Sequence, residues 1–266
     1  MPAPAAHVGV LLRRWRGVRR ASQLGLAEMA GVSSRHLSFI ETGRAQPSRE
    51  MVARLAEALE IPLRERNALF LAAGYAPAYS ETRLAEPGMA RVRQAIDFIL
   101  RQQEPYPAYV LTRHWDLLQT NTGSKRIFGF LRGGERTHSN ILREIFDPKA
   151  LRRVVVNWEE VAGELIRHLH NEVAATPSDS RAAALLEEML AYPDVPSAWR
   201  NRDLSAPVMP LMTAVYRKND LELRFFSTIT TFGTPQDVTL EELRIECAFP
   251  ADETTERICR DLAAGA

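Results

Sequence analysis

The chain has 266 residues, of which 45% are hydrophobic and 25% are charged, and its formal net charge is +1. This length is enough for roughly two domains, each with an apolar core. The sequence has no apolar run of the roughly 18 residues that a membrane-spanning helix needs, no signal-peptide pattern, and too few cysteines for a disulfide framework or a cysteine-based metal site. We therefore expect a cytoplasmic protein with no membrane partner.

The N-terminal part of the chain is basic, although the total charge is close to zero. Residues 1–80 contain eleven arginines and six glutamates, for a net charge of +5, whereas residues 81–266 have a net charge of −4. Five of these arginines fall between Arg13 and Arg20, in the first predicted helix (residues 7–20). Such a surface attracts nucleic acid with an affinity that depends on salt. The charge agrees with DNA binding and would also suit RNA or an acidic protein.

The segment at residues 22–47 has the residue spacing of a helix-turn-helix. Four small or apolar residues set that spacing: Ala27, Gly31, Leu37 and Ile40. Ala27 is small enough for two short helices to cross closely, and Gly31 can adopt the left-handed conformation of a sharp turn between them. Leu37 and Ile40, three residues apart, direct one face of the second helix back onto the first.

The opposite face of that second helix is polar, which predicts that it contacts DNA. Its side chains can hydrogen-bond phosphates or base edges. Gln23, at the start of the preceding helix, lies where backbone amides can bind a phosphate, and Arg44 follows the second helix in a turn. The alternative is a solvated charged surface, but the complete spaced set favours DNA contact. The predicted DNA-binding residues are Gln23, Ser33, Ser34, Arg35, His36, Ser38 and Arg44.

Helical periodicity and capping residues predict three further helices in this region, at residues 7–20, 48–59 and 63–73. With the two helices of the helix-turn-helix they form an all-α five-helix domain, which we place at residues 1–76. Ser22, Ser33 and Ser48 are expected to cap the helices that they precede.

These residues resemble the Cro/C1-type helix-turn-helix of the XRE class, in the lambda-repressor-like fold, over about residues 7–73. The resemblance extends to Glu41-Thr42-Gly43 at the end of the second helix. It implies that this second helix recognises a double-stranded DNA operator, and that Arg16 pairs with Glu41, an ion pair that fixes geometry more than it adds stability. The alternative is two unrelated surface charges. One recognition helix reads few base pairs, so we expect a homodimer with two such helices about 34 Å apart.

The remaining chain alternates between strand and helix patterns. Residues 77–105 are predicted to be a linker and a connecting helix (residues 89–103), because two prolines and two glycines interrupt residues 74–88. Period-two alternation then predicts a strand with Tyr109 and Leu111 and another with Trp115, Leu117 and Gln119. Helical patterns dominate residues 140–200, and strands are expected at residues 221–232 and 240–249, before a last helix at residues 252–262. We therefore expect residues 106–266 to form an α+β domain with extra helices, and one that is PAS-like, because strand, turn, strand and capped helix is also the order in which a PAS-type domain begins.

This second domain resembles the ligand-binding domain of MmyB-like transcription regulators. The resemblance is carried by AAGYAP at residues 72–77, PAYVLTRHWDLLQTN at 107–121, NWEEVAGEL at 157–165 and FFSTITTFGTPQDVTLEELRIE at 225–246. It implies that the domain binds a small apolar molecule, such as a fatty acid, and we expect no other cofactor.

The strand and helix patterns give candidate pocket residues, because a pocket is mainly apolar with a few placed polar groups. The alternative for each of them is ordinary core packing. The candidates are Tyr109, Leu111, Trp115, Leu117, Phe128, Phe225, Ser227 and Ile229.

No pattern in the sequence indicates catalysis or a metal site. His168 and His170 are two residues apart, so on a helix they point in nearly opposite directions and cannot both bind one metal ion. No nucleophile elbow, P-loop or dinucleotide-binding fingerprint is present. We therefore expect a regulator without enzyme activity. Two alternatives remain open: a second domain that serves only for dimerisation, which a copurifying lipid would argue against, and an enzyme domain fused to a DNA-binding domain, which a pocket with converging titratable groups would favour.

Overall fold

The structure, a computed structural model, describes residues 7–201 and 211–265. Its contacts divide the chain into two compact units. The head unit consists of Met1–Glu86 together with Phe232–Glu241, and the body unit consists of Pro87–Thr231 together with Glu242–Ala266. The chain therefore passes three times between the units.

The head unit contains the five predicted helices. Ser22, Ser33 and Ser48 each accept a backbone N–H through their hydroxyl, and so cap the helix that follows. The core between the helices is built from fully buried side chains such as those of Leu12 and Leu55. The helices are α1 (Val8–Val18), α2 (Gln23–Met29), α3 (Ser34–Glu41), α4 (Arg49–Ala58) and α5 (Leu63–Ala72).

Two glycines determine how the first three helices meet. Gly31 has a φ of +63°, the left-handed conformation predicted for the turn between α2 and α3. Gly9 brings α1 against the end of α3: a Cβ on Gly9 would lie 2.2 Å from the carbonyl oxygen of Ile40. Ala27, which the sequence pattern predicted at the close crossing, is buried. Nothing in the pattern marked Gly9.

The head unit also includes a distant segment, Phe232–Glu241, which connects two strands of the body unit. The carboxylate of Asp237 accepts hydrogen bonds from Ser80 Oγ at 2.9 Å and from the backbone N–H of Thr82 at 3.0 Å. Glu241 Oε2 accepts from the backbone N–H of Leu63 at 2.8 Å, at the start of α5, where the N-cap residue Pro62 makes no side-chain hydrogen bond. Glu241 thus provides a cap for α5 that its own sequence lacks.

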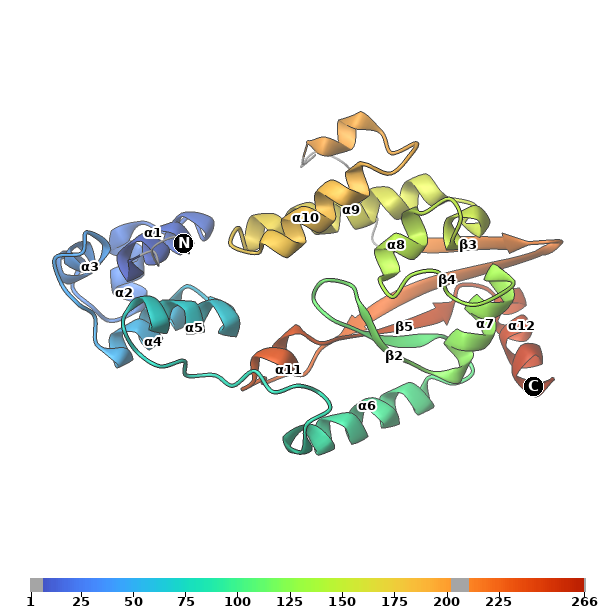
Figure 1. Ribbon diagram of the computed structural model, residues 1–266, viewed down its shortest axis with the longest axis horizontal. Coiled ribbons are helices and arrows are strands. Elements are labelled where there is room, and N and C mark those ends of the chain that lie inside the picture. Colours follow the sequence, from blue (N-terminus) through green and yellow to red (C-terminus); the bar gives the residue numbers. More distant parts are fainter. Residues whose placement is uncertain (1–6, 202–210, 266) are drawn as a thin grey trace. The chain divides into compact units, whose positions relative to one another are not determined.

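The body unit is built on a five-stranded antiparallel sheet with the order β2-β1-β5-β4-β3 (Figure 1). Two strand predictions need correction, and one strand was not predicted. Trp115 lies in the turn between two strands, with a φ of +66°, and not in the second strand. The strand expected from residue 240 begins at Arg244, because Val238–Glu242 forms the short helix α11. The strand at Thr213–Lys218, β3, was not predicted. The strands are β1 (Ala108–Leu111), β2 (Leu117–Thr120), β3 (Thr213–Lys218), β4 (Leu221–Thr230) and β5 (Arg244–Pro250).

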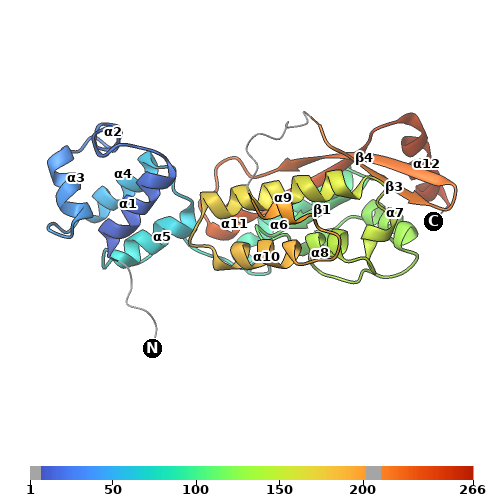
Figure 2. The same cartoon turned by 90° about the horizontal axis from the view of Figure 1, so that it is seen from above.

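Helices cover both faces of this sheet. In Figure 1, α8, α9 and α10 lie on one side and α6 on the other, and Figure 2 shows α9 and α10 side by side. The main core of the unit lies under α8–α10, with Phe146 and Leu223 fully buried in it. None of the described helices is long and apolar enough to cross a membrane. The elements besides the strands are η1 (Pro87–Met89), α6 (Ala90–Gln102), α7 (Thr122–Arg132), α8 (Ile141–Phe146), η2 (Leu151–Val154), α9 (Trp158–Ala175), α10 (Ser180–Leu190), η3 (Ser197–Arg200) and α12 (Glu253–Ala264).

Candidate DNA interface and ligand cavity

Helix α3 presents a polar face to solvent, as its sequence predicts. Leu37 and Ile40 are fully buried against the head core. Ser33, Ser34 and Arg35 are exposed. His36 and Ser38 are half-buried on the same helix. The outward side chains are therefore those that can donate and accept hydrogen bonds on a DNA surface.

An ion pair fixes the end of α3 against α1. Arg16 donates from Nε to Glu41 Oε1 at 2.8 Å and from Nη2 to Glu41 Oε2 at 3.0 Å. Burial alone would raise the pKa of the Glu41 carboxyl, but the hydrogen bonds and charge of Arg16, aided by Gln23 and Arg13, outweigh it and lower that pKa. The same pairing raises the pKa of Arg16. This is the pair that the resemblance implied, and it joins the end of α3 to α1.

Gln23 belongs to the same network. Its side-chain Nε2 donates to Glu41 Oε2 at 3.0 Å, and the residue is half-buried. Arg44, the other flanking candidate, is exposed just after Gly43, whose φ is +75°. The phosphate contacts of Gln23 and Arg44 stay predictions.

Three of the five arginines between Arg13 and Arg20 also bond within the head unit. Besides Arg16, Arg13 donates to the carbonyl oxygen of Glu41 at 3.2 Å, and Arg19 donates to those of Leu59 and Glu60, both at 2.8 Å. Arg14 and Arg20 are exposed. The basic run therefore stabilises helix ends as well as supplying positive charge.

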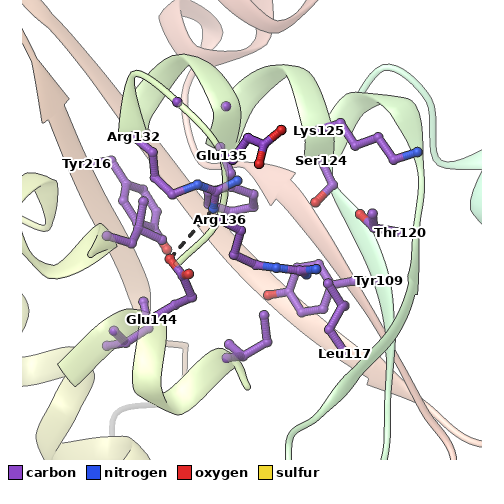
Figure 3. A pocket seen from close by; sticks show the side chains of 16 residues that line it. Tyr109, Leu117, Thr120, Ser124, Lys125, Arg132, Glu135, Arg136, Glu144 and Tyr216 are labelled. Atoms are coloured by element: carbon purple, nitrogen blue, oxygen red, sulfur yellow. Dashed lines mark ion pairs between the residues drawn. The ribbon is translucent and has the colours of Figure 1, made fainter. Parts of the chain in front are cut away.

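A cavity of about 560 Å³ lies in the body unit between α7, α8 and the sheet (Figure 3). This volume is in the range of small-molecule sites, roughly 300–1,000 Å³. Its wall combines apolar side chains with charged ones. The residues lining it are Tyr109, Leu117, Thr120, Ser124, Lys125, Phe128, Gly129, Arg132, Gly134, Glu135, Arg136, Ile141, Glu144, Ile145, Leu151 and Tyr216.

The predicted pocket residues divide into three groups. Tyr109, Leu117 and Phe128 line this cavity. The others do not line it: three are buried in the core and two are exposed on β4. The buried ones are Leu111, Trp115 and Phe225, and the exposed ones are Ser227 and Ile229.

The charged part of the cavity wall was missed by the sequence analysis. Arg132 and Glu144 point toward one another across it (Figure 3), with Arg132 Nη1 3.9 Å from Glu144 Oε2. The pKa of Arg132 is lowered overall. Burial and the charge of the nearby Arg136 lower it, and together they outweigh the charge of Glu144, which raises it. Charged residues on helices normally face solvent, so the sequence pattern gave no sign that Glu144 is buried and Arg132 half-buried beside it.

Two tyrosines give the cavity neutral hydroxyl groups. Burial, followed by the charge of Glu246, raises the pKa of both Tyr109 and Tyr216 well above the ordinary value. Both phenols therefore stay protonated at neutral pH, and they can donate and accept hydrogen bonds.

The histidines of α9 bond to separate partners. His168 Nε2 lies 3.1 Å from Glu172 Oε1, whereas His170 Nε2 lies 2.8 Å from the carbonyl oxygen of Trp199. Within residues 7–201 and 211–265, no group of three histidine, cysteine or acidic side chains is arranged to hold a metal ion.

Comparison with known proteins matches both units to families. The family model for the MmyB-like transcription regulator ligand-binding domain matches residues 92–262, and the model for a helix-turn-helix domain matches residues 7–69. No curated protein matches the chain. A solved structure described as an RNA-binding light-oxygen-voltage receptor is similar at 11% identity with a TM-score of 0.27, over 96% of this chain. The chain spans 62% of that structure.

Proposed function

Because the chain belongs to the MmyB-like transcription regulators, we propose that it reads a DNA operator through α3 and that a small molecule in the body-unit cavity changes this reading. The observation that carries the proposal is the exposed polar face of α3, whose last residue pairs with Arg16 of α1. Base edges are read by side chains such as Arg35, while backbone contacts give affinity. The proposed contacts are those of Gln23, Ser33, Ser34, Arg35, His36, Ser38 and Arg44.

We propose that the ligand has an apolar body, and a fatty acid, which the family resemblance implies, is one such molecule. Leu117, Phe128 and Ile145 supply apolar wall to the cavity. No metal or further cofactor is needed for this role, and we propose no catalytic step. The ligand regulates by binding one arrangement of the protein more tightly than another, and the factor by which it changes operator affinity equals the factor by which the operator changes ligand affinity.

We further propose a cytoplasmic homodimer. One recognition helix covers few base pairs, and pairing two heads on half-sites one DNA turn apart supplies the missing affinity and specificity.

The test is the operator affinity of the full chain before and after its bound small molecule is removed. A duplex is first selected from a random pool with the purified protein, and native mass spectrometry reports subunit count and bound mass in each sample. We expect a dimer with a lipid-sized adduct, and a change in operator affinity of at least about fivefold on removal. A dimer that carries no adduct would instead favour a body unit that serves only for dimerisation.

A further inference from the structure

Phe39 is a large apolar side chain at the surface of α3. It is half-buried, and it is not among the described side chains that pack against the head core. The other two apolar residues of this helix, Leu37 and Ile40, are fully buried in that core. Packing of the head core therefore does not explain why an aromatic ring stands at this position.

The ring of Phe39 faces the side chain of Arg35, one helical turn earlier. The guanidinium carbon of Arg35 lies over the ring, 5.5 Å from its centroid. A cation within about 6 Å of the centroid is attracted to the face of an aromatic ring, and residues four apart lie on the same side of a helix. Phe39 thus restricts the directions in which the flexible Arg35 side chain can point.

Arg35 differs from the other arginines that lie over aromatic rings in the head unit. Four such arginines occur among the described residues of the unit. Three of them, Arg19, Arg49 and Arg66, also donate hydrogen bonds to backbone carbonyl oxygens. Arg35 has no hydrogen-bond or ion-pair partner within residues 7–201 and 211–265. Its guanidinium is therefore held by a ring while all its N–H donors stay free.

This arrangement suits the recognition of guanine. Arginine donates two parallel hydrogen bonds to O6 and N7 of guanine, the commonest specific contact in the major groove. The ring attracts the face of the guanidinium and leaves the donors at its edge unused. A mobile arginine loses side-chain entropy when it binds a base, and an arginine that a ring already holds loses less.

Resting on the proposed reading of an operator by α3, we propose that Phe39 is a positioning residue whose ring orients Arg35 toward a guanine of the operator. Arg35 makes the contact with the base, and Phe39 acts through Arg35. The ring contributes a factor of about two to five in operator affinity, and this contribution vanishes wherever Arg35 is absent.

The first experiment is a double-mutant cycle on the full chain. Fluorescence anisotropy measures the affinity for the selected operator of the wild type, Phe39→Leu, Arg35→Ala and the double variant. Leucine keeps an apolar side chain but removes the ring, so we expect Phe39→Leu to weaken operator binding about two- to fivefold, and to have no effect in the Arg35→Ala background. Phe39→Tyr keeps the ring and should bind like the wild type. An equal loss from Phe39→Leu in both backgrounds, or no loss in either, would overturn the proposal.

A second experiment identifies the base that Arg35 contacts. The guanines of the operator are replaced one at a time by 7-deazaguanine, which lacks the N7 acceptor. We expect a guanine at which this replacement weakens binding by the wild type but not by Arg35→Ala, and at which the loss is smaller for Phe39→Leu than for the wild type. A loss that depends on Arg35 at none of the guanines would overturn the assignment of the base.

The wild-type affinities separate this inference from the proposed function. A wild type that binds the selected operator and a scrambled duplex equally would contradict operator reading. A wild type that discriminates between the two duplexes, combined with an equal effect of Phe39→Leu in both backgrounds, would leave operator reading in place and overturn only the positioning role of Phe39.

Discussion

Replacing Gly9 with alanine tests whether the recognition helix is positioned by close contact with α1. The added Cβ would lie 2.2 Å from the carbonyl oxygen of Ile40 and 2.8 Å from Cα of Glu41, and both are backbone atoms that cannot rotate away. An ordinary contact needs α1 to retreat by about 1 Å. Overpacking of this kind costs about 1–3 kcal/mol, and alanine returns at most about 1 kcal/mol of helix propensity. The clash is with backbone atoms, so we take the upper end of this cost, and after the propensity gain we expect a net loss of about 2 kcal/mol in the head unit.

Gly17→Ala is the matched control on the same helix. Gly17 is exposed, and a Cβ there would meet nothing within 4 Å, so this variant should stabilise the head by up to about 1 kcal/mol. The assay is hydrogen exchange followed by mass spectrometry on peptides from α1 and α3. A loss of 2 kcal/mol raises their exchange rate by about 30-fold. Equal protection in the Gly9→Ala and Gly17→Ala variants would refute the reasoning.

Four further predictions concern the head unit. Arg35→Ala should weaken operator binding by about 1–3 kcal/mol more than binding to random DNA, whereas Arg14→Ala should weaken both equally. Fluorescence anisotropy measures both affinities. If Arg35→Ala weakened binding to the operator and to random DNA equally, Arg35 would not read bases. Gly31→Val should destabilise the head by about 1–3 kcal/mol in urea unfolding, and Gly31→Asn by less, because asparagine tolerates the left-handed conformation. Glu41 has a folded pKa below its ordinary value of 4.5, so its contribution to stability is complete above that pH and is lost as the pH falls through the folded pKa. Glu41→Gln should lower the free energy of unfolding at neutral pH and reduce its fall in acid. An unchanged fall in acid would argue against the Arg16–Glu41 pair. Glu241→Ala should speed amide exchange in the first turn of α5, since losing a cap costs about 0.5–2 kcal/mol, and unchanged exchange would show that the cap is dispensable.

The features that the sequence predicted well are local ones. Ser22, Ser33 and Ser48 cap the helices that they precede, and Gly31 turns the chain where the pattern required it. A cap or a turn depends on a few neighbouring residues, so its signal is complete within a short window of sequence. The five-helix head and the α+β body follow from such signals together with hydrophobic periodicity.

The features that the sequence did not predict depend on distant contacts. Gly9 in α1 carries no turn signal, and its importance appears only where α3 crosses it. Residues 232–241 belong to the head unit through hydrogen bonds of Asp237 and Glu241 to residues more than 150 positions earlier, which no local pattern encodes. Glu144 looks like a solvated helix residue in sequence, yet it lines the cavity and is buried.

The measurement that tests the central claim most directly is the ratio of affinities of the full chain for its selected operator and for a scrambled duplex of the same composition. Both are titrated at one ionic strength, about that of the cell, because phosphate contacts alone make affinity depend on salt. We predict that the protein binds the operator at least about 10³-fold more tightly than the scrambled duplex. Equal affinities for the two duplexes would show that α3 does not read sequence, and would contradict the account.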